Sequence, residues 1–181
     1  MDIITAPKNR GASLFPEKIN GKYVRLERPF PVYSRGGKDR FDLWLSTSPD
    51  LKFWGETELV LAVEDVPYAN DKIGPAAPPI KTDKGWLDII HGVSTTAGGT
   101  YYSLGAMLLD LNEPWKVIGK TNSYILKPEL ENELHGNSDN TVFACGAIAD
   151  YENDRIKLYY GGCDQCINLA IGSLSELVEA C

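Results

Sequence analysis

A pattern of strands and turns repeats along the 181-residue chain, and this repeat limits the fold more than any other feature. Segment 43–54 has an echo at 104–115, 61 residues later, and a fainter one at 169–177, another 65 residues on. Each copy follows a hairpin. A hairpin, a third strand and an acidic-leucine turn at such a period are typical of β-propeller blades. A β-sandwich with a coincidental repeat is the alternative.

Strand patterns extend over the whole length. Alternating, branched or aromatic-rich segments lie at 22–28, 41–46, 86–91, 101–109 and 155–160. Turn-forming pairs such as Asn20-Gly21 and Gly98-Gly99 separate them. Only 173–180 is expected to form a helical turn or two. We therefore predict an all-β chain, a single domain over 1–181 with propeller blades at about 12–66, 72–125 and 140–181.

Three blades do not close a ring. An open arc exposes a sheet edge and apolar blade faces, which soluble proteins avoid. We therefore expect that another chain completes the ring, that the arc forms a homo-oligomer, or that the chain is part of a longer protein.

The composition argues against some classes of binding partner. The formal net charge is −7, with 43% apolar and 24% charged residues, as in ordinary soluble proteins. The negative charge argues against nucleic acid or an anionic membrane as partner. No apolar run approaches the roughly 20 residues that span a bilayer, and no leader-like segment opens the chain. We expect a cytoplasmic protein.

The cysteines give only a weak metal signal. Cys163-Asp-Gln-Cys166 has the spacing of a redox motif or half a zinc site, but no second pair accompanies it. We expect isolated thiols and no bound metal.

Four side chains suited to binding an oxyanion lie on or beside expected strands: Arg10, Arg28, Lys72 and His91. The planar fork of arginine meets two oxygens at once, and lysine adds a point charge. Brought together, the four would form a local cradle for inorganic phosphate in a globally acidic protein. Each residue also has an alternative role that involves no phosphate. It is that of a solvated surface charge or, for His91, a core histidine bonded to the backbone.

Short motifs, in order along nearly the whole chain, carry a family resemblance. They include Phe15-Pro-Glu-Lys-Ile-Asn-Gly-Lys-Tyr23, Leu43-Trp-Leu-Ser-Thr-Ser-Pro-Asp-Leu51, Asp71-Lys-Ile-Gly74, Pro78-Pro-Ile-Lys-Thr82, Phe143-Ala-Cys-Gly-Ala147 and Tyr159-Tyr-Gly-Gly-Cys-Asp164. This order resembles the β-mannoside phosphorylases of glycoside hydrolase family 130. The resemblance implies a five-bladed β-propeller with its active site at the mouth of the central channel, and this chain is similar to the C-terminal three blades.

The resemblance also implies a function and its residues. Such enzymes transfer a mannosyl unit from a β-mannoside to inorganic phosphate with inversion, which releases mannose 1-phosphate. Arg10, Arg28, Lys72 and His91 fall on the phosphate-binding positions, and Asp164 falls on that of a carboxylate that binds mannosyl hydroxyl groups. The implied partners are a β-mannoside or related oligosaccharide and phosphate as co-substrate, without any cofactor.

One catalytic residue of the family pattern, the proton donor, has no match in this sequence. The resemblance places the proton donor on an aspartate in blades that precede Arg10, and Asp2 does not lie in that motif. We therefore assign no catalytic residue in this chain. A non-catalytic sugar- or phosphate-binding arc and a hydrolytic β-mannosidase stay open as alternatives. Lys72 and His91 speak against the hydrolase, because hydrolytic members of the family tend to replace this pair.

Overall fold

The computed structural model describes residues 4–5, 9–30 and 41–181, which form three antiparallel sheets. The first sheet has the order β1 (Asn9–Leu14), β2 (Tyr23–Pro29), β3 (Leu43–Ser48) and β4 (Gly55–Leu61). The second has the order β5 (Lys72–Pro75), β7 (Trp86–Thr96), β8 (Gly99–Leu109) and β9 (Val117–Lys120), with β6 (Ile80–Lys81) also beside β7. The third has the order β10 (Val142–Asp150), β11 (Arg155–Gly162) and β12 (Cys166–Ser173). The chain is mostly β, as its sequence predicts.

Within residues 4–5, 9–30 and 41–181, helical structure is limited to short segments. They are a 3₁₀ turn η1 (Val63–Asp65), α1 (Glu131–Leu134) and α2 (Leu174–Glu179). The last lies within the predicted 173–180, and it begins where the Ser173 hydroxyl accepts a hydrogen bond from the Glu176 N–H, a common N-cap. Among the described residues, no helix has the length and apolar character that crossing a membrane requires.

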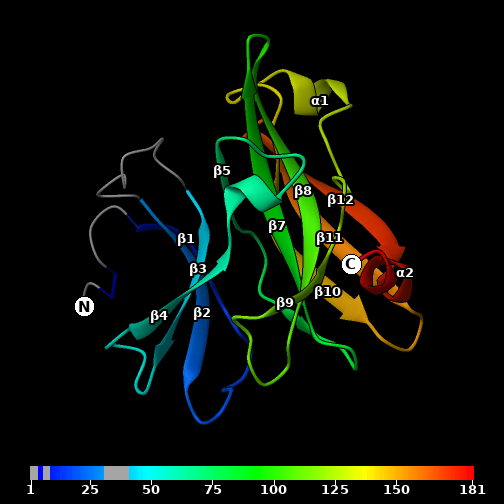
Figure 1. Cartoon of the computed structure of the whole chain (residues 1–181). Helices are drawn as coiled ribbons and strands as arrows, with labels where there is room; N and C mark the ends of the chain where they lie inside the picture. The colour runs from blue at the N-terminus through cyan, green and yellow to red at the C-terminus, as the bar shows by residue number, and fades with distance from the viewer. Residues whose placement is uncertain (1–3, 6–8, 31–40) are drawn as a thin grey trace.

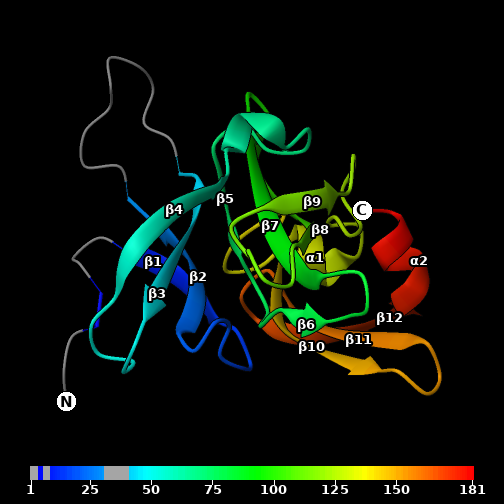
Figure 2. The same ribbon diagram turned by 60° about the horizontal axis from the view of Figure 1, so that its bottom comes forward.

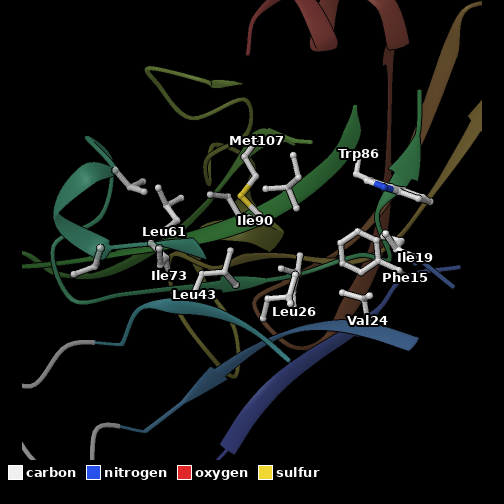
Figure 3. Close-up of a cluster of buried hydrophobic side chains, with 14 residues drawn as sticks. Phe15, Ile19, Val24, Leu26, Leu43, Leu61, Ile73, Trp86, Ile90 and Met107 are labelled. Atoms are coloured by element: carbon white, nitrogen blue, oxygen red, sulfur yellow. The ribbon is translucent and has the colours of Figure 1, made fainter. Parts of the chain in front are cut away.

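The sheets lie side by side in chain order, with the second between the other two (Figures 1 and 2). One core cluster joins the first sheet to the second; in it the rings of Phe15 and Trp86 meet edge to face, 5.2 Å between centroids (Figure 3). Another cluster joins the second sheet to the third, with Leu87 packed among residues such as Leu158. Because side chains of a strand alternate between faces, a sheet covered on both sides buries consecutive residues. The first eight residues of β7 are accordingly all buried.

Two predicted turns set the strand register. Asn20 and Gly21 both have positive φ, 51° and 80°, and this backbone suits a two-residue hairpin turn. Gly99, with φ of 123°, follows the turn between β7 and β8. Pairing of Thr96 with Gly99 then fixes the whole hairpin, and it places His91 opposite Leu104.

A buried carboxyl group lies within β7. Asp88 is 0% exposed, and neither of its carboxylate oxygens has a hydrogen-bond partner in the described part of the chain. Burial raises the pKa of Asp88 well above its usual value, because the ionised form loses its hydration. The stability linked to this group is therefore present below the pKa of an unfolded aspartate, and it is lost as the pH rises through the raised pKa of the fold.

We expect Asp88→Asn to raise the melting temperature, more at pH 8 than at pH 5, because the amide does not ionise. In a chain of this size each 1 kcal/mol of added stability raises Tm by about 2–4 °C. Thermal unfolding followed by circular dichroism at both pH values measures the effect. The exposed Asp83→Asn serves as the control. A gain that is equal at the two pH values, or absent at pH 8, would contradict the unpaired carboxyl.

Candidate functional site

The fold brings the four predicted basic residues together from two sheets. Arg10 in β1 and Arg28 in β2 are direct cross-strand partners. Nη1 of Arg28 lies 3.2 Å from Nε2 of His91, which belongs to β7 of the second sheet. Lys72 begins β5, the strand that pairs with β7 around His91, and its charge acts on the imidazole. The sequence alone could propose these residues as a group; the strand pairing makes them neighbours.

His91 accepts rather than donates at its contact with Arg28. A guanidinium carries only donors and stays protonated, so Nη1–H donates and the imidazole Nε2 accepts. Burial, aided by the charges of Arg28 and Lys72 and opposed by a hydrogen bond with the Pro75 backbone, lowers the pKa of His91 from 6.5 to about 3. The imidazole is therefore neutral at physiological pH. It adds no positive charge to the site, and it does not titrate between pH 5 and 8.

The contact between His91 and Arg28 is possible because residue 74 is a glycine, which has no side chain. Gly74 in β5 pairs directly with His91 in β7. A Cβ atom at Gly74 would lie 2.6 Å from Cε1 and 2.9 Å from Nε2 of His91, closer than real Cβ atoms approach. The imidazole therefore occupies the space that any other residue at 74 would fill, and from there it reaches Arg28.

Two aromatic rings surround the imidazole. Tyr102 of β8 stacks 6.2 Å from His91 between centroids, and its centroid lies 5.4 Å from Nζ of Lys72. Phe143 of β10 contributes a ring 4.7 Å from the imidazole, so the third sheet also contacts the cluster. A cation over an aromatic face is attracted by about 0.5–1 kcal/mol at an exposed site. Sequence reasoning did not assign Tyr102 to this cluster, although the Gly98-Gly99 turn places it opposite Val93, two residues from His91.

The cluster contains a buried donor that lacks an acceptor. Nε of Arg28 has no hydrogen-bond partner among the residues that the structure describes. Burial is the main cause that lowers the pKa of Arg28, and the charge of Arg10 lowers it further, while Tyr102 and Asp71 oppose this. Asp71 also lies 3.8 Å from Nζ of Lys72 and partly offsets its charge. A small anion would provide the acceptor that Nε of Arg28 lacks.

Asp164 lies outside this cluster. It occupies the turn between β11 and β12, where it and Cys163 have φ of 57° and 49° and Gln165 N–H donates to Gly162 O. The side chain is exposed, and no described contact joins it to the basic residues. The turn nevertheless lies at the end of the third sheet that holds Phe143, because Phe143 pairs with Gly161.

The Cys163/Cys166 pair flanks the same turn. Cys163 is buried and Cys166 is half-buried, and all four cysteines of the chain are free thiols. Cys166 Sγ accepts a hydrogen bond from Asn132 Nδ2 at 3.1 Å. The two thiols thus form part of the packing around the β11–β12 turn.

Comparisons with known proteins agree with this architecture. Residues 2–181 match the family model described as β-1,4-mannooligosaccharide phosphorylase. The chain is 40% identical over 174 residues to the β-1,4-mannooligosaccharide phosphorylase of Ruminococcus albus, which covers 96% of this chain and 50% of the relative. It is 40% identical over 176 residues to the β-1,2-mannobiose phosphorylase of Listeria innocua. This match covers 97% of this chain and 47% of the relative.

Solved structures show the same relationship. The β-1,2-mannobiose phosphorylase from Listeria innocua, in complex with β-1,2-mannobiose, superposes with a TM-score of 0.86 and 38% identity over 98% of this chain and 48% of that structure. A more distant structure comes from work on family members that hydrolyse β-1,2 mannosidic linkages. It shares the fold of this chain, with a TM-score of 0.73 and 22% identity. The chain spans about half the length of the relatives it matches. It belongs to glycoside hydrolase family 130, the family of the mannoside phosphorylases.

Proposed function

We propose that this chain is the phosphate-binding part of a β-mannoside phosphorylase. The observation that carries the proposal is the convergence of Arg10, Arg28 and Lys72 around a buried donor without an acceptor, Nε of Arg28. Buried polar groups in folded proteins are almost always hydrogen-bonded. A phosphate oxygen would satisfy Nε, and charge-assisted bonds from guanidinium and ammonium groups are the ones that hold a divalent anion most strongly.

Phosphate as the nucleophile fits a site of cations. An inverting hydrolase needs a carboxylate that activates water on the face opposite the leaving group. Phosphate is already ionised at neutral pH, so the protein has to dock it and align one oxygen with the anomeric carbon. The new bond from phosphate oxygen to carbon forms as the bond to the glycosidic oxygen breaks, and inversion gives α-mannose 1-phosphate. The glycosidic oxygen takes up a proton from an acid to which we assign no residue of this chain.

The remaining parts of the proposal concern the whole protein. We take the three sheets as three blades of a five-bladed ring, with the other blades outside this sequence. Asp164, on the turn of the third sheet, would bind hydroxyl groups of the mannosyl unit above the phosphate. The relatives are named for β-1,4- and β-1,2-linked mannosides alike. The proposed substrate class is therefore a β-mannoside, with no single linkage.

The test supplies the missing blades. This chain is combined with the half of the Listeria innocua phosphorylase that it does not match, and the pair is incubated with β-1,2- or β-1,4-mannobiose, with and without phosphate. We expect mannose 1-phosphate, detected by ³¹P NMR, only when phosphate is present. Release of free mannose without phosphate would identify a hydrolase instead. Phosphate binding without turnover of either sugar would identify a non-catalytic binding arc.

A further inference from the structure

Glu133 is a buried carboxylate that the proposed reaction does not use. It lies in α1 and is 2% exposed. Its Oε1 accepts a hydrogen bond of 2.7 Å from the hydroxyl group of Tyr160 in β11. Its Oε2 accepts from the backbone N–H groups of Glu129 and Leu130, at 2.9 and 3.0 Å. The carboxylate thus ties residues 129–141, which we call the α1 segment, to the third sheet.

These hydrogen bonds keep the carboxylate ionised. Burial by itself raises the pKa of Glu133, but the N–H groups of Leu130 and Glu129 and the Tyr160 hydroxyl together lower the pKa below its usual value. Burial, and next the hydrogen bond to Glu133, raise the pKa of Tyr160 to about 12, so its hydroxyl keeps the proton and donates. Hydrogen bonds to a charged acceptor are the stronger ones. Glu133 is therefore a firm anchor for the α1 segment.

The α1 segment lies against the β11–β12 turn that contains Asp164. Backbone hydrogen bonds join the two: Cys163 N–H donates to Thr141 O at 3.0 Å, and Ser138 N–H donates to Cys163 O at 3.1 Å. Nδ2 of Asn137 donates to the carbonyl oxygen of Asp164 itself, at 3.3 Å. The position of the turn therefore depends on the position of the α1 segment.

The backbone of the turn needs such support. Cys163 and Asp164 have φ of 49° and 57°, a left-handed conformation that residues with a Cβ atom rarely adopt. Residues in this conformation persist where the surrounding structure holds them there. Gly136 lets the α1 segment come close enough, because a Cβ atom at this position would lie only 2.5 Å from Cβ of Cys163.

The α1 segment also contacts the second sheet beside the basic residues. Tyr102 N–H donates to Asn140 O at 3.0 Å, and Tyr102 forms an isolated β-bridge with Thr141. The ring of Tyr102 stacks on His91. In Figure 1, α1 lies at the end of the sheets where β7 turns into β8, away from α2. One short segment thus joins the surroundings of His91 to the turn with Asp164.

We infer that Glu133 is a positioning residue for sugar binding: it anchors the α1 segment, which holds the Asp164 turn in place relative to the basic residues. The inference rests on the proposed function, in which Asp164 binds hydroxyl groups of the mannosyl unit. Glu133 acts only through Asp164 and contacts neither sugar nor phosphate. The phosphate site does not depend on it, because the β7–β8 ladder keeps Tyr102 opposite Val93.

The test uses the enzyme completed with the other half of the Listeria innocua phosphorylase, as above. Glu133→Ala removes the acceptor of three hydrogen bonds, so the KM for β-1,2-mannobiose should rise about tenfold or more. The KM for phosphate should stay within about twofold. Glu133→Gln should restore most of the affinity, because its amide oxygen accepts from the two backbone N–H groups and its NH₂ group donates to the Tyr160 hydroxyl. The amide of Cys163 should exchange hydrogen faster in Glu133→Ala.

Two controls separate positioning from a general loss of stability. Asp154→Ala removes another carboxylate of the third sheet, which accepts hydrogen bonds from Ser173 and Ser175 at the start of α2, and it should change neither KM. In an Asp164→Ala background, Glu133→Ala should raise the KM for mannobiose by less than about twofold, because residues that act as one unit are not additive. Circular dichroism confirms that each variant folds.

Three outcomes would overturn the inference. They are an unchanged KM for mannobiose in Glu133→Ala, an equal rise in the KM for phosphate, and an undiminished effect in the Asp164→Ala background. Tyr160→Phe removes one of the three hydrogen bonds and should raise the same KM by a smaller factor; it replaces Glu133→Ala if that variant does not fold.

The same measurements distinguish this inference from the proposed function. Release of mannose without phosphate would defeat the proposed function alone, because the KM for mannobiose is equally measurable in hydrolysis. Without any turnover, the dissociation constant for mannobiose from an NMR titration takes the place of KM. An effect of Asp164→Ala without one of Glu133→Ala would defeat this inference alone. An unchanged affinity in Asp164→Ala would defeat the proposed role of Asp164 and this inference with it.

Discussion

Arg28→Ala is expected to reduce kcat/KM for phosphorolysis by the completed enzyme about 100- to 1,000-fold, the usual effect of removing one anion-stabilising donor. The substitution removes the fork that holds phosphate, and it leaves Nε2 of His91 without its donor. Most of the loss should fall on the KM for phosphate. The measurement is the rate of mannose 1-phosphate release as phosphate is varied, and Lys72→Ala should act in the same direction.

Two further variants make this result specific. Arg28→Lys keeps the positive charge but loses the planar fork, so its activity should lie between that of Ala and wild type. Arg155→Ala removes an exposed arginine at the start of β11 and should leave the rate unchanged. A wild-type KM for phosphate in Arg28→Ala would refute the assignment of this cluster.

Gly74→Ala is expected to abolish measurable phosphate binding although it leaves all four basic residues in the sequence. The β5–β7 ladder holds both backbones, so a Cβ atom 2.6 Å from Cε1 forces the imidazole of His91 to move. The movement breaks its hydrogen bond with Arg28. Overpacking of this kind also destabilises a fold by about 1–3 kcal/mol. Phosphate titration by ³¹P NMR and thermal unfolding measure the two effects separately.

Matched variants distinguish the clash from a general loss of strand stability. Gly146→Ala adds a methyl group in β10, where no atom lies within 4 Å, and should change neither property. Gly74→Ala combined with His91→Ala removes the clash and should recover stability but not phosphate affinity. Wild-type affinity in Gly74→Ala would show that the Arg28–His91 contact is not needed.

Local patterns were sufficient for most of the secondary structure. The predicted strand 155–160 lies within β11, and 101–109 lies within β8, because alternation and branched side chains act within one strand. The turn at Asn20-Gly21 follows from residues that tolerate positive φ. The short helix after Ser173 follows from its own N-cap. Each of these depends only on neighbours along the chain.

Such local patterns did not predict how the sheets pack against one another. Tyr102 and Phe143 contact His91 from two other strands, β8 and β10. These strands begin at Gly99 and Val142, which are 8 and 51 residues after His91 in the sequence. The place of β12 at the end of its sheet could likewise not be predicted, because a strand pattern does not say which strand ends its sheet. Only the order of the strands in the third sheet shows this.

The amino-acid sequence by itself determined the strands, the turns and the kinds of side chain that could meet an anion: two arginines, a lysine and a histidine. The tertiary structure alone decided what one of them does. His91 is neutral and accepts a hydrogen bond from Arg28 because surrounding sheets remove it from water and Gly74 leaves it room. A pKa depends on burial and on charges from distant segments, and only the folded chain brings these together.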